Sequence, residues 1–291
     1  MISPFVLHRP ATLQDALSVV QQHGEEAKVL AGGSELILLC KMGLLRPRHL
    51  IDIKGISGLD RVELDPRTHA LRVGGLVTHR ALETSLLVQE RFPVLAAMER
   101  QVANVRVRNV GTLAGNLCFA EPHADPGSLL LAYQATVKAS SVRGDRSLEM
   151  ADFFLDYYKT ALGDDEILTE IEIPELKGNF TGTYLRFCPG ERPIVGLALL
   201  LAWKDGVCEE SRLVLGCVGP RPIRASEIEE DLRGRSPDEI SAKALAVGAK
   251  AAFLCDPLPD IWGSVEYKRQ IVKTLVSRGL EQLCEEGAAH E

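Results

Sequence analysis

The sequence predicts an α+β protein with a domain boundary near residues 174–181, and three observations support this. A strand-like segment near the N-terminus runs into a glycine turn and a helix, which is typical of a small α/β unit. Pro, Gly, Asn and Lys cluster at the boundary itself. Beyond it, strand patterns near 183–187, 194–203 and 212–217 precede helical patterns near 225–232, 237–253 and 265–283.

The N-terminal segment predicts a helix followed by a strand–turn–helix–strand unit. Thr12 and Asp15 together favour a helix start, and Gly24 ends the helix. The unit then follows as a strand at 28–30, a glycine turn, an apolar helix at 36–42 and a strand at 49–53. Such a unit brings the start of a helix, with its free N–H groups, to a ligand.

The next elements are strands at 61–64 and 70–73 around the turn 65–68, a helix at 78–87, and a helix at 94–102 that begins after Pro93. A β-branched stretch at 105–110 then leads into a second glycine turn. We expect Arg106 and Arg108 in this stretch to be solvated rather than to neutralise a phosphate. Asp125 and Pro126 have the residue types of an N-cap and a first helical position.

Two glycine turns carry most of the chemical information: Lys28–Leu36 (KVLAGGSEL) and Asn109–Asn116 (NVGTLAGN). Glycine lets backbone N–H groups approach a ligand closely, and the hydroxyl and amide side chains add donors. The first turn also opens a helical pattern, whose positive end would face a phosphate. Either turn alone is more often a plain tight turn, but the pair indicates a pyrophosphate held from two sides, and hence a dinucleotide.

The chain contains neither G-x-G-x-x-G nor G-x-x-x-x-G-K-[ST]. This argues against a Rossmann dinucleotide-binding domain and against a P-loop enzyme.

The blocks around these turns resemble one family, the FAD-binding medium subunits of the molybdenum hydroxylases. The flavin chains of carbon monoxide, nicotinate, quinoline and xanthine dehydrogenases belong to it. The resemblance runs in order from about Phe5 to the C-terminal helix, so it covers nearly the whole chain. The matching blocks are residues 31–36, 50–53, 71–75, 111–116, 125–126, 152–154 and 166–174.

The resemblance implies a fold and its domains. Residues 1–176 would form an FAD-binding domain of the vanillyl-alcohol-oxidase or PCMH type, with α/β subdomains at about 1–54 and 55–176. Residues 177–291 would form a C-terminal α+β domain of the CO dehydrogenase flavoprotein type, with a three-stranded antiparallel sheet and helices.

The resemblance also implies which residues hold a noncovalent FAD. The two turns would surround the pyrophosphate, Asp125 would lie near the ribityl or adenosine part, Leu168 near a ring, and Val102 and Ala103 close to the flavin. The turn residues concerned are Val29, Leu30, Ala31, Gly32, Gly33, Ser34, Glu35, Leu36, Gly111, Thr112, Gly115 and Asn116. Asp125 also has the structural task of an N-cap, and the sequence leaves both roles open.

The chain departs from the family pattern away from the pyrophosphate turns. Members of the carbon monoxide type resemble Ala-Gly-Gly-His-Ser in the first turn, where this chain has no histidine. Members of the xanthine type carry an aromatic residue and a lysine near the isoalloxazine, where this chain has Val102 and Gly196. The loop Cys188–Pro193 also differs from the usual Arg-rich, Asp-containing stretch. These differences bear on the redox properties of the flavin and on its electron acceptor.

The implied activity is that of an oxidoreductase subunit. Substrate would be oxidised on a molybdopterin large subunit, and electrons would pass through [2Fe–2S] clusters of a small subunit to this FAD and then to an external acceptor. The assembly would be a heterotrimer or its dimer. Two alternatives stay open: a stand-alone FAD-dependent reductase or oxidase of the same fold, and a flavin-free structural subunit. We expect no catalytic residue on this chain, because the flavin itself supplies redox chemistry.

Composition narrows the remaining classes. The net charge of −7 and the lack of a long basic run argue against a nucleic-acid partner. The longest apolar run, 194–203, is half of the about 20 residues that a membrane-spanning helix needs. No signal peptide is visible. The seven scattered cysteines form no C-x-x-C, which indicates reduced, buried thiols in a cytoplasm and no iron–sulfur cluster on this chain.

Histidines and acidic residues give no further site. His69, His79 and His123 stand alone, so we expect no metal site. The acidic run 164–166 has the composition of a solvated turn.

Overall fold

The computed structural model describes residues 2–288 and divides into two compact units. The first unit comprises the chain up to Arg91, Glu99–Ala120 and Gln134–Glu175, and the second comprises Phe92–Met98, Glu121–Tyr133 and the chain from Leu176 onward. The chain therefore enters the second unit twice before it reaches the predicted boundary at 174–181.

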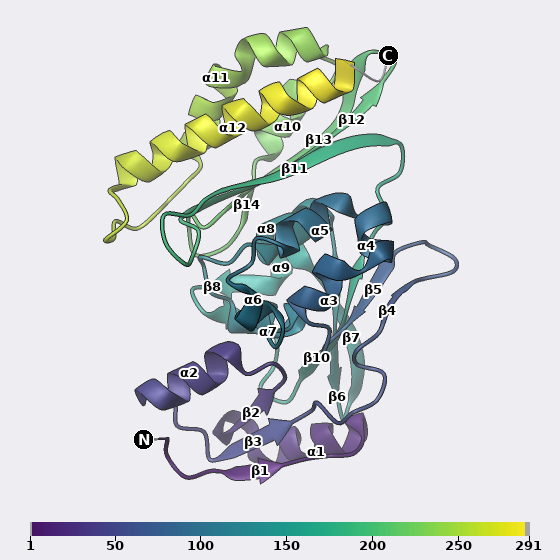
Figure 1. Cartoon of the computed structure of the whole chain (residues 1–291), viewed down its shortest axis with the longest axis vertical. Helices are drawn as coiled ribbons and strands as arrows, with labels where there is room; N and C mark the ends of the chain where they lie inside the picture. The colour runs from purple at the N-terminus through teal and green to yellow at the C-terminus, as the bar shows by residue number, and fades with distance from the viewer. Residues whose placement is uncertain (1, 289–291) are drawn as a thin grey trace. The chain divides into compact units, whose positions relative to one another are not determined.

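The first unit begins with a parallel sheet in the order β1-β3-β2 (Figure 1). Its strands are β1 Val6–His8, β2 Ala27–Leu30 and β3 His49–Asp52. Helix α1, Leu13–His23, connects β1 to β2, and its start is capped as predicted, because Thr12 Oγ1 accepts the N–H of Asp15. The buried face of α1 packs in one cluster with Ile51 of β3, which fixes the helix against the sheet.

A five-stranded antiparallel sheet completes the first unit in the order β4-β5-β10-β6-β7. Its strands are β4 Val62–Leu64, β5 Leu71–Gly74, β6 Thr136–Ser141, β7 Gly144–Glu149 and β10 Ile167–Ile173. Between β7 and β10 lie α9 Met150–Phe153, β8 Phe154–Asp156 and β9 Lys159–Thr160. The β4–β5 hairpin follows the prediction, whereas the β6–β7 hairpin was not anticipated.

Among the helices of the first unit, one predicted helix is divided and one further helix was not predicted. The helix expected at 78–87 is divided at Ser85, which adopts an extended backbone, into α3 His79–Thr84 and α4 Leu86–Arg91. The β-branched stretch at 105–110 is not extended but forms α6 Val105–Arg108. The cause is Asn104, whose side-chain oxygen accepts the N–H groups of residues 106 and 107 and so starts a helical turn.

The second unit contains an antiparallel sheet in the order β11-β12-β13-β14. Its strands are β11 Asn179–Phe187, β12 Val195–Lys204, β13 Val207–Gly216 and β14 Ile223–Arg224, so a short fourth strand joins the three that were predicted. The helices are α5 Pro93–Glu99, α8 Pro126–Ala132, α10 Ser226–Leu232, α11 Pro237–Phe253 and α12 Val265–Ala288.

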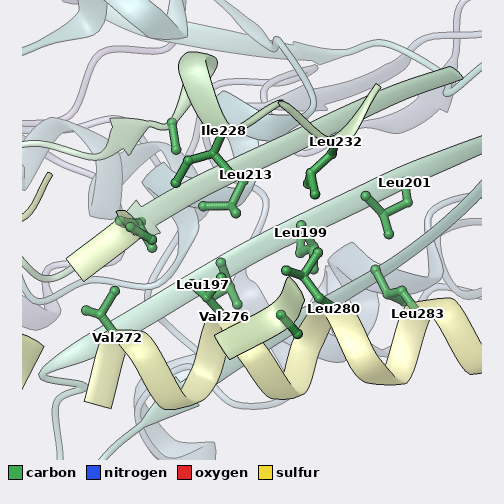
Figure 2. Packing of buried hydrophobic residues seen from close by; sticks show 14 of the residues in the cluster. Leu197, Leu199, Leu201, Leu213, Ile228, Leu232, Val272, Val276, Leu280 and Leu283 are labelled. Atoms are coloured by element: carbon green, nitrogen blue, oxygen red, sulfur yellow. The ribbon is translucent and has the colours of Figure 1, made fainter. Parts of the chain in front are cut away.

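Strand β12 is buried on both faces, which explains the long apolar run of the sequence. Leu197, Leu199 and Leu201 project toward the face of α12 that carries Val276 and Leu280 (Figure 2). The alternate residues of β12 are buried as well, and α8 contacts this strand. Across residues 2–288, none of the helices combines the length and apolarity needed to cross a bilayer.

All seven cysteines are free thiols. Five are buried as predicted, but Cys118 is exposed and Cys188 is half-buried, so the expectation of burial was wrong for these two.

Candidate functional site

The first glycine turn leaves the parallel sheet at the carboxyl ends of its strands. Strands β2 and β3 run in the same direction, with Leu30 opposite Asp52. The residues that follow the two strands therefore emerge at the same edge, where ligands of open α/β sheets bind. Ala31 and Gly32 after β2, and Lys54 and Gly55 after β3, line one cavity there.

Gly33 is the N-cap of helix α2, Ser34–Met42, and has φ +77°. This left-handed conformation favours glycine, because a side chain there is strained. Glycine has no side chain to cap the helix, so the first N–H groups of α2 receive no side-chain cap. Such groups, together with the helix dipole, form an anion-binding position.

Ser34 adds a donor that the protein itself does not use. Its Oγ is buried and has no hydrogen-bond partner. A buried unpaired hydroxyl is costly, and so it marks a position that a ligand can complete.

The second turn is fixed by its own helix and by the segment before α3. Thr112 caps α7, Leu113–Phe119, because its Oγ1 accepts the N–H of Gly115 at 2.9 Å. The carbonyl of Gly111 accepts the N–H of His79 at 3.0 Å. Behind this contact, His79 Nδ1 lies 2.6 Å from a carboxylate oxygen of Glu99, and both side chains are buried.

The two turns touch each other, and this contact requires glycine. A Cβ on Gly32 would overlap the carbonyl oxygen of Val110, and a Cβ on Gly111 would lie 3.3 Å from Ser34 Oγ. Part of the glycine pattern therefore serves the packing of turn against turn, in addition to any approach of backbone N–H groups to a phosphate.

A cavity of 410 Å³ opens beside the joined turns. This volume falls within the range of small-molecule sites. Its lining residues are Ala31, Gly32, Lys54, Gly55, Ile56, Ser57, Asp60, Leu76, Thr78, Asn109, Val110 and Thr112. Of the predicted site residues, Ala31, Gly32 and Thr112 line it directly.

Sequence reasoning missed the part of the lining contributed by the loop after β3. Lys54, Ser57 and Asp60 are its polar members, and Lys54 Nζ lies 2.6 Å from Asp52. A signal was available, because polar residues that follow a second parallel strand must emerge beside the first turn.

These features fit a pyrophosphate-containing cofactor. The uncapped N–H groups at the start of α2, the unpartnered Ser34 hydroxyl and the Lys54 ammonium can all donate to an anion. The first two belong to the turn that the sequence predicted to hold a pyrophosphate, and Lys54 adds to them.

The remaining predicted residues of the first unit lie elsewhere. Leu168 is buried in β10 at a bulge, and neither it nor Val102 or Ala103 lines the cavity. Ala103 has a positive φ of 44°. Arg108 is not solvated as expected, because it donates to the carbonyl of Val102 and pairs with Glu83.

Asp125 lies in the second unit at the start of α8, but its side chain does not cap the helix. Its carboxylate instead accepts the hydroxyl of Tyr184 at 3.0 Å and a guanidinium N–H of Arg186 at 2.7 Å. Burial raises the pKa of Tyr184 well above its usual value, and Asp125 raises it further, so the phenol stays protonated as a donor. The predicted positions, Asp125 as N-cap and Pro126 as first helical residue, are confirmed, although the aspartate side chain makes no capping bond.

Gly196, where the resemblance implied a lysine in members of the xanthine type, faces the same tyrosine. A Cβ there would lie 2.7 Å from the hydroxyl of Tyr184. The absence of a side chain at 196 makes room for the contact between Tyr184 and Asp125.

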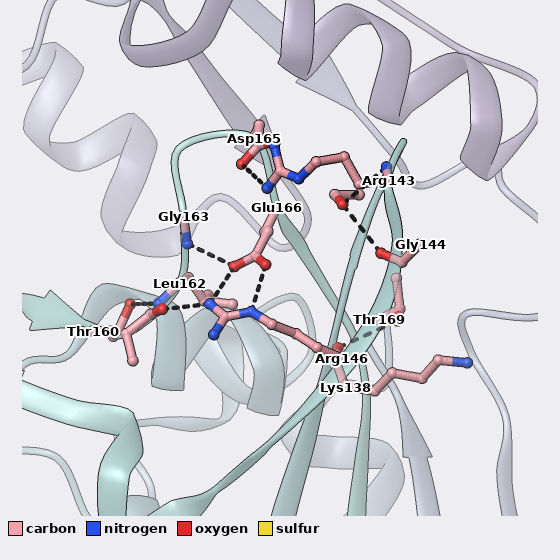
Figure 3. Close-up of polar contacts among 12 residues, drawn as sticks. Lys138, Arg143, Gly144, Arg146, Thr160, Leu162, Gly163, Asp165, Glu166 and Thr169 are labelled. Carbon is pink, nitrogen blue, oxygen red and sulfur yellow. Dashed lines mark hydrogen bonds and ion pairs between the residues drawn. The ribbon is translucent and has the colours of Figure 1, made fainter.

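The acidic run 164–166 begins in a turn with Asp164 exposed, as predicted, but Asp165 and Glu166 form ion pairs (Figure 3). Glu166 is largely buried and accepts two bonds from Arg146, at 2.6 and 2.8 Å, and one from the N–H of Gly163 at 2.7 Å. Asp165 pairs with Arg143. The prediction of solvation was wrong for these two residues because the two arginines come from the β6–β7 hairpin, which the sequence analysis did not identify.

Comparison with known proteins agrees with the predicted resemblance. Residues 3–176 match the family described as the FAD binding domain in molybdopterin dehydrogenase, and residues 189–283 match the CO dehydrogenase flavoprotein C-terminal domain.

Individual relatives are similar over almost their whole length. The chain is 31% identical to the nicotine 6-hydroxylase medium subunit of Paenarthrobacter nicotinovorans, over 92% of this chain and 93% of that protein. It is 30% identical to the carbon monoxide dehydrogenase medium chain of Hydrogenophaga pseudoflava, over 96% and 97%. Among solved structures, quinoline 2-oxidoreductase from Pseudomonas putida 86 superposes with a TM-score of 0.92 at 28% identity, over 99% of each chain. The predicted resemblance and fold class are thereby confirmed.

Proposed function

Because this chain belongs to the FAD-binding medium subunits of the molybdenum hydroxylases, we propose that it receives electrons from an iron–sulfur partner and passes them to an external acceptor. Bound FAD supplies the redox chemistry, and the protein supplies position and electrostatics. The observation that carries this proposal is the pair of touching glycine turns, with the unpartnered Ser34 hydroxyl between them and the cavity beside them.

The residues of this chain have binding roles in the proposal. The N–H groups at the start of α2, Ser34 Oγ and the second turn would hold the pyrophosphate, and Lys54 would balance its charge. The other predicted contacts, at Asp125, Leu168, Val102 and Ala103, remain proposals. So do the domain boundaries 1–176 and 177–291, which the family matches ending at 176 and starting at 189 support.

The partners follow from the family. We expect an iron–sulfur small subunit with [2Fe–2S] clusters and a molybdopterin large subunit, assembled with this chain as a heterotrimer or its dimer. The seven free thiols suit a reducing compartment, so we place the complex in the cytoplasm.

Co-expression tests this function. The chain is produced alone and with two candidate partner chains, and aldehydes, purines, aromatic N-heterocycles and carbon monoxide are assayed with an artificial acceptor. We expect substrate oxidation only by the three-chain complex. Turnover by the single chain would favour the stand-alone flavoenzyme, and a colourless complex that is active without FAD would favour a structural subunit.

A further inference from the structure

Three histidines that are distant in the sequence meet on the first unit. His8 ends β1, His23 ends α1 and His49 begins β3. One ring nitrogen of each lies within 4.8 Å of those of the other two, and His8 Nε2 is 2.9 Å from His49 Nδ1. The rings of His23 and His49 are stacked, with centroids 3.6 Å apart. All three side chains are half-buried, so they are accessible from solvent.

We propose that His8, His23 and His49 bind a divalent transition-metal ion of the zinc type, with water in the remaining coordination position. Three imidazoles and one water form an established zinc donor set. Nitrogens about 2.0–2.1 Å from a tetrahedral ion lie about 3.3 Å apart. The ligand atoms here all lie within 4.8 Å of one another, and binding one ion requires side-chain rotations that turn the stacked rings of His23 and His49 apart.

The backbone that carries the three histidines is fixed without an ion. Val6 of β1 pairs with His49 of β3, and the N–H of Val6 donates to the carbonyl of Arg48 at 2.8 Å. Helix α1, which ends at His23, is held against β3 by the cluster that contains Ile51. Ligands on such a prepared framework lose little freedom on binding, which favours affinity.

A metal ion binds the neutral form of an imidazole, so metal binding is expected to weaken in acid, where histidine becomes protonated. The charged side chains of Glu26 and Arg48, next to the cluster, pair with each other at 3.1 Å.

This site is separate from the flavin cavity. His49 is the first residue of β3, whereas the cavity is lined by residues that follow the strand. A bound ion would join β1, α1 and β3, and would act as a brace for the parallel sheet. The expectation of no metal site rested on isolated histidines, and it overlooked this trio because the three lie on β1, α1 and β3 and meet only in the folded unit.

The test is to titrate tag-free, chelator-treated full-length protein with zinc sulfate and to measure binding by isothermal titration calorimetry. We expect one zinc ion per chain and a higher midpoint of thermal unfolding when zinc is present. His23→Gln and His8→Gln should each weaken binding by at least about tenfold. His69→Asn is the matched control, since His69 is exposed elsewhere in the first unit and asparagine tolerates its positive φ.

Circular dichroism of each metal-free variant establishes whether it is folded. If His8→Gln does not fold, His23→Gln, which changes a residue at a helix end, decides the question. Failure of the wild type to bind zinc at one ion per chain would overturn the proposal. Binding by a folded His23→Gln variant with wild-type affinity would overturn it as well, because the ion would then lie elsewhere.

Discussion

Ser34 offers a single-residue test of the flavin site, since its buried hydroxyl has no partner in the protein. We predict that Ser34→Ala weakens FAD binding by about 1.5–3 kcal/mol, the typical worth of a hydrogen bond to a charged group. This corresponds to about 10- to 150-fold in the dissociation constant. The flavin-free protein should keep its stability, because the substitution removes no bond from it. Fluorescence titration with FAD and thermal unfolding measure the two effects.

Ser18→Ala is the control for this variant, because Ser18 is exposed on α1 and bonds only within its helix. Equal FAD affinities of Ser34→Ala and the wild type would place the cofactor away from the start of α2.

Gly33 is constrained both by its backbone and by its surroundings, because a Cβ there would lie 2.7 Å from Leu30 Cδ1. Its φ of +77° lies where a β-branched residue is most strained, by about 1–3 kcal/mol. We predict that Gly33→Val reduces FAD retention more than Asn116→Ala, which removes one amide donor at most. Gly33→Asn should retain more FAD than Gly33→Val, because asparagine tolerates this conformation. Similar flavin content in all three purified variants would contradict the role assigned to the turn.

At the scale of single residues, the sequence predicts the role of a residue when the local backbone dictates its type. Gly32 and Gly33 were proposed from the sequence because glycine lets backbone N–H groups approach a phosphate. Lys54 and Ser57 were not, since they reach the cavity only through the parallel pairing of β2 with β3. The bonds from Tyr184 and Arg186 to Asp125 were missed for a related reason, because about 60 residues of chain separate the partners.

At the level of elements, the pair formed by Arg146 and Glu166 connects the β6–β7 hairpin to the start of β10 (Figure 3). The bonds from Arg146 lower the pKa of Glu166 below its usual value. Because the folded pKa is the lower one, the ionised carboxylate stabilises the fold above the unfolded pKa of about 4.3. This stabilisation is lost as the pH falls through the folded value.

We therefore predict that Glu166→Gln lowers the free energy of unfolding by about 1 kcal/mol at pH 7. The difference from the wild type should narrow below about pH 4, where Glu166 itself becomes protonated. Urea unfolding of the flavin-free wild type and variant, at pH 7 and below about pH 4, measures the loss of stability and its narrowing. As a control, Asp164→Asn removes an exposed neighbouring carboxylate and should leave the free energy of unfolding nearly unchanged at either pH. A deficit of the same size at both pH values would mean that the charge of Glu166 is not the stabilising factor.

Long periodic elements were predictable, and short ones that depend on neighbours were not. The apolar pattern is long enough to predict the secondary structure of helices α11 and α12 and of strand β12 from their own residues. Strand β7 is mostly exposed and has little apolar pattern, so it is defined only by its pairing with β6. Helix α6 depends on a single cap at Asn104, which overrides the β-branched residues that follow.

At the scale of the whole molecule, the order of the chain does not match the order of the units. Helices α5 and α8 precede the predicted boundary but lie, apart from the last residue of α5, in the second unit. Helix α8 packs against β12 and β13 there. A linear division of the sequence could place the boundary at 174–181 but not these two crossings, which depend on contacts between distant segments.

The central claim is that this chain holds one noncovalent FAD through two glycine turns. The most direct measurement is acid precipitation of the purified complex, followed by chromatographic identification and quantification of the released flavin. We predict one FAD per copy of this chain in the supernatant. Release of FMN, flavin retained in the precipitated protein, or no flavin at all would contradict the claim.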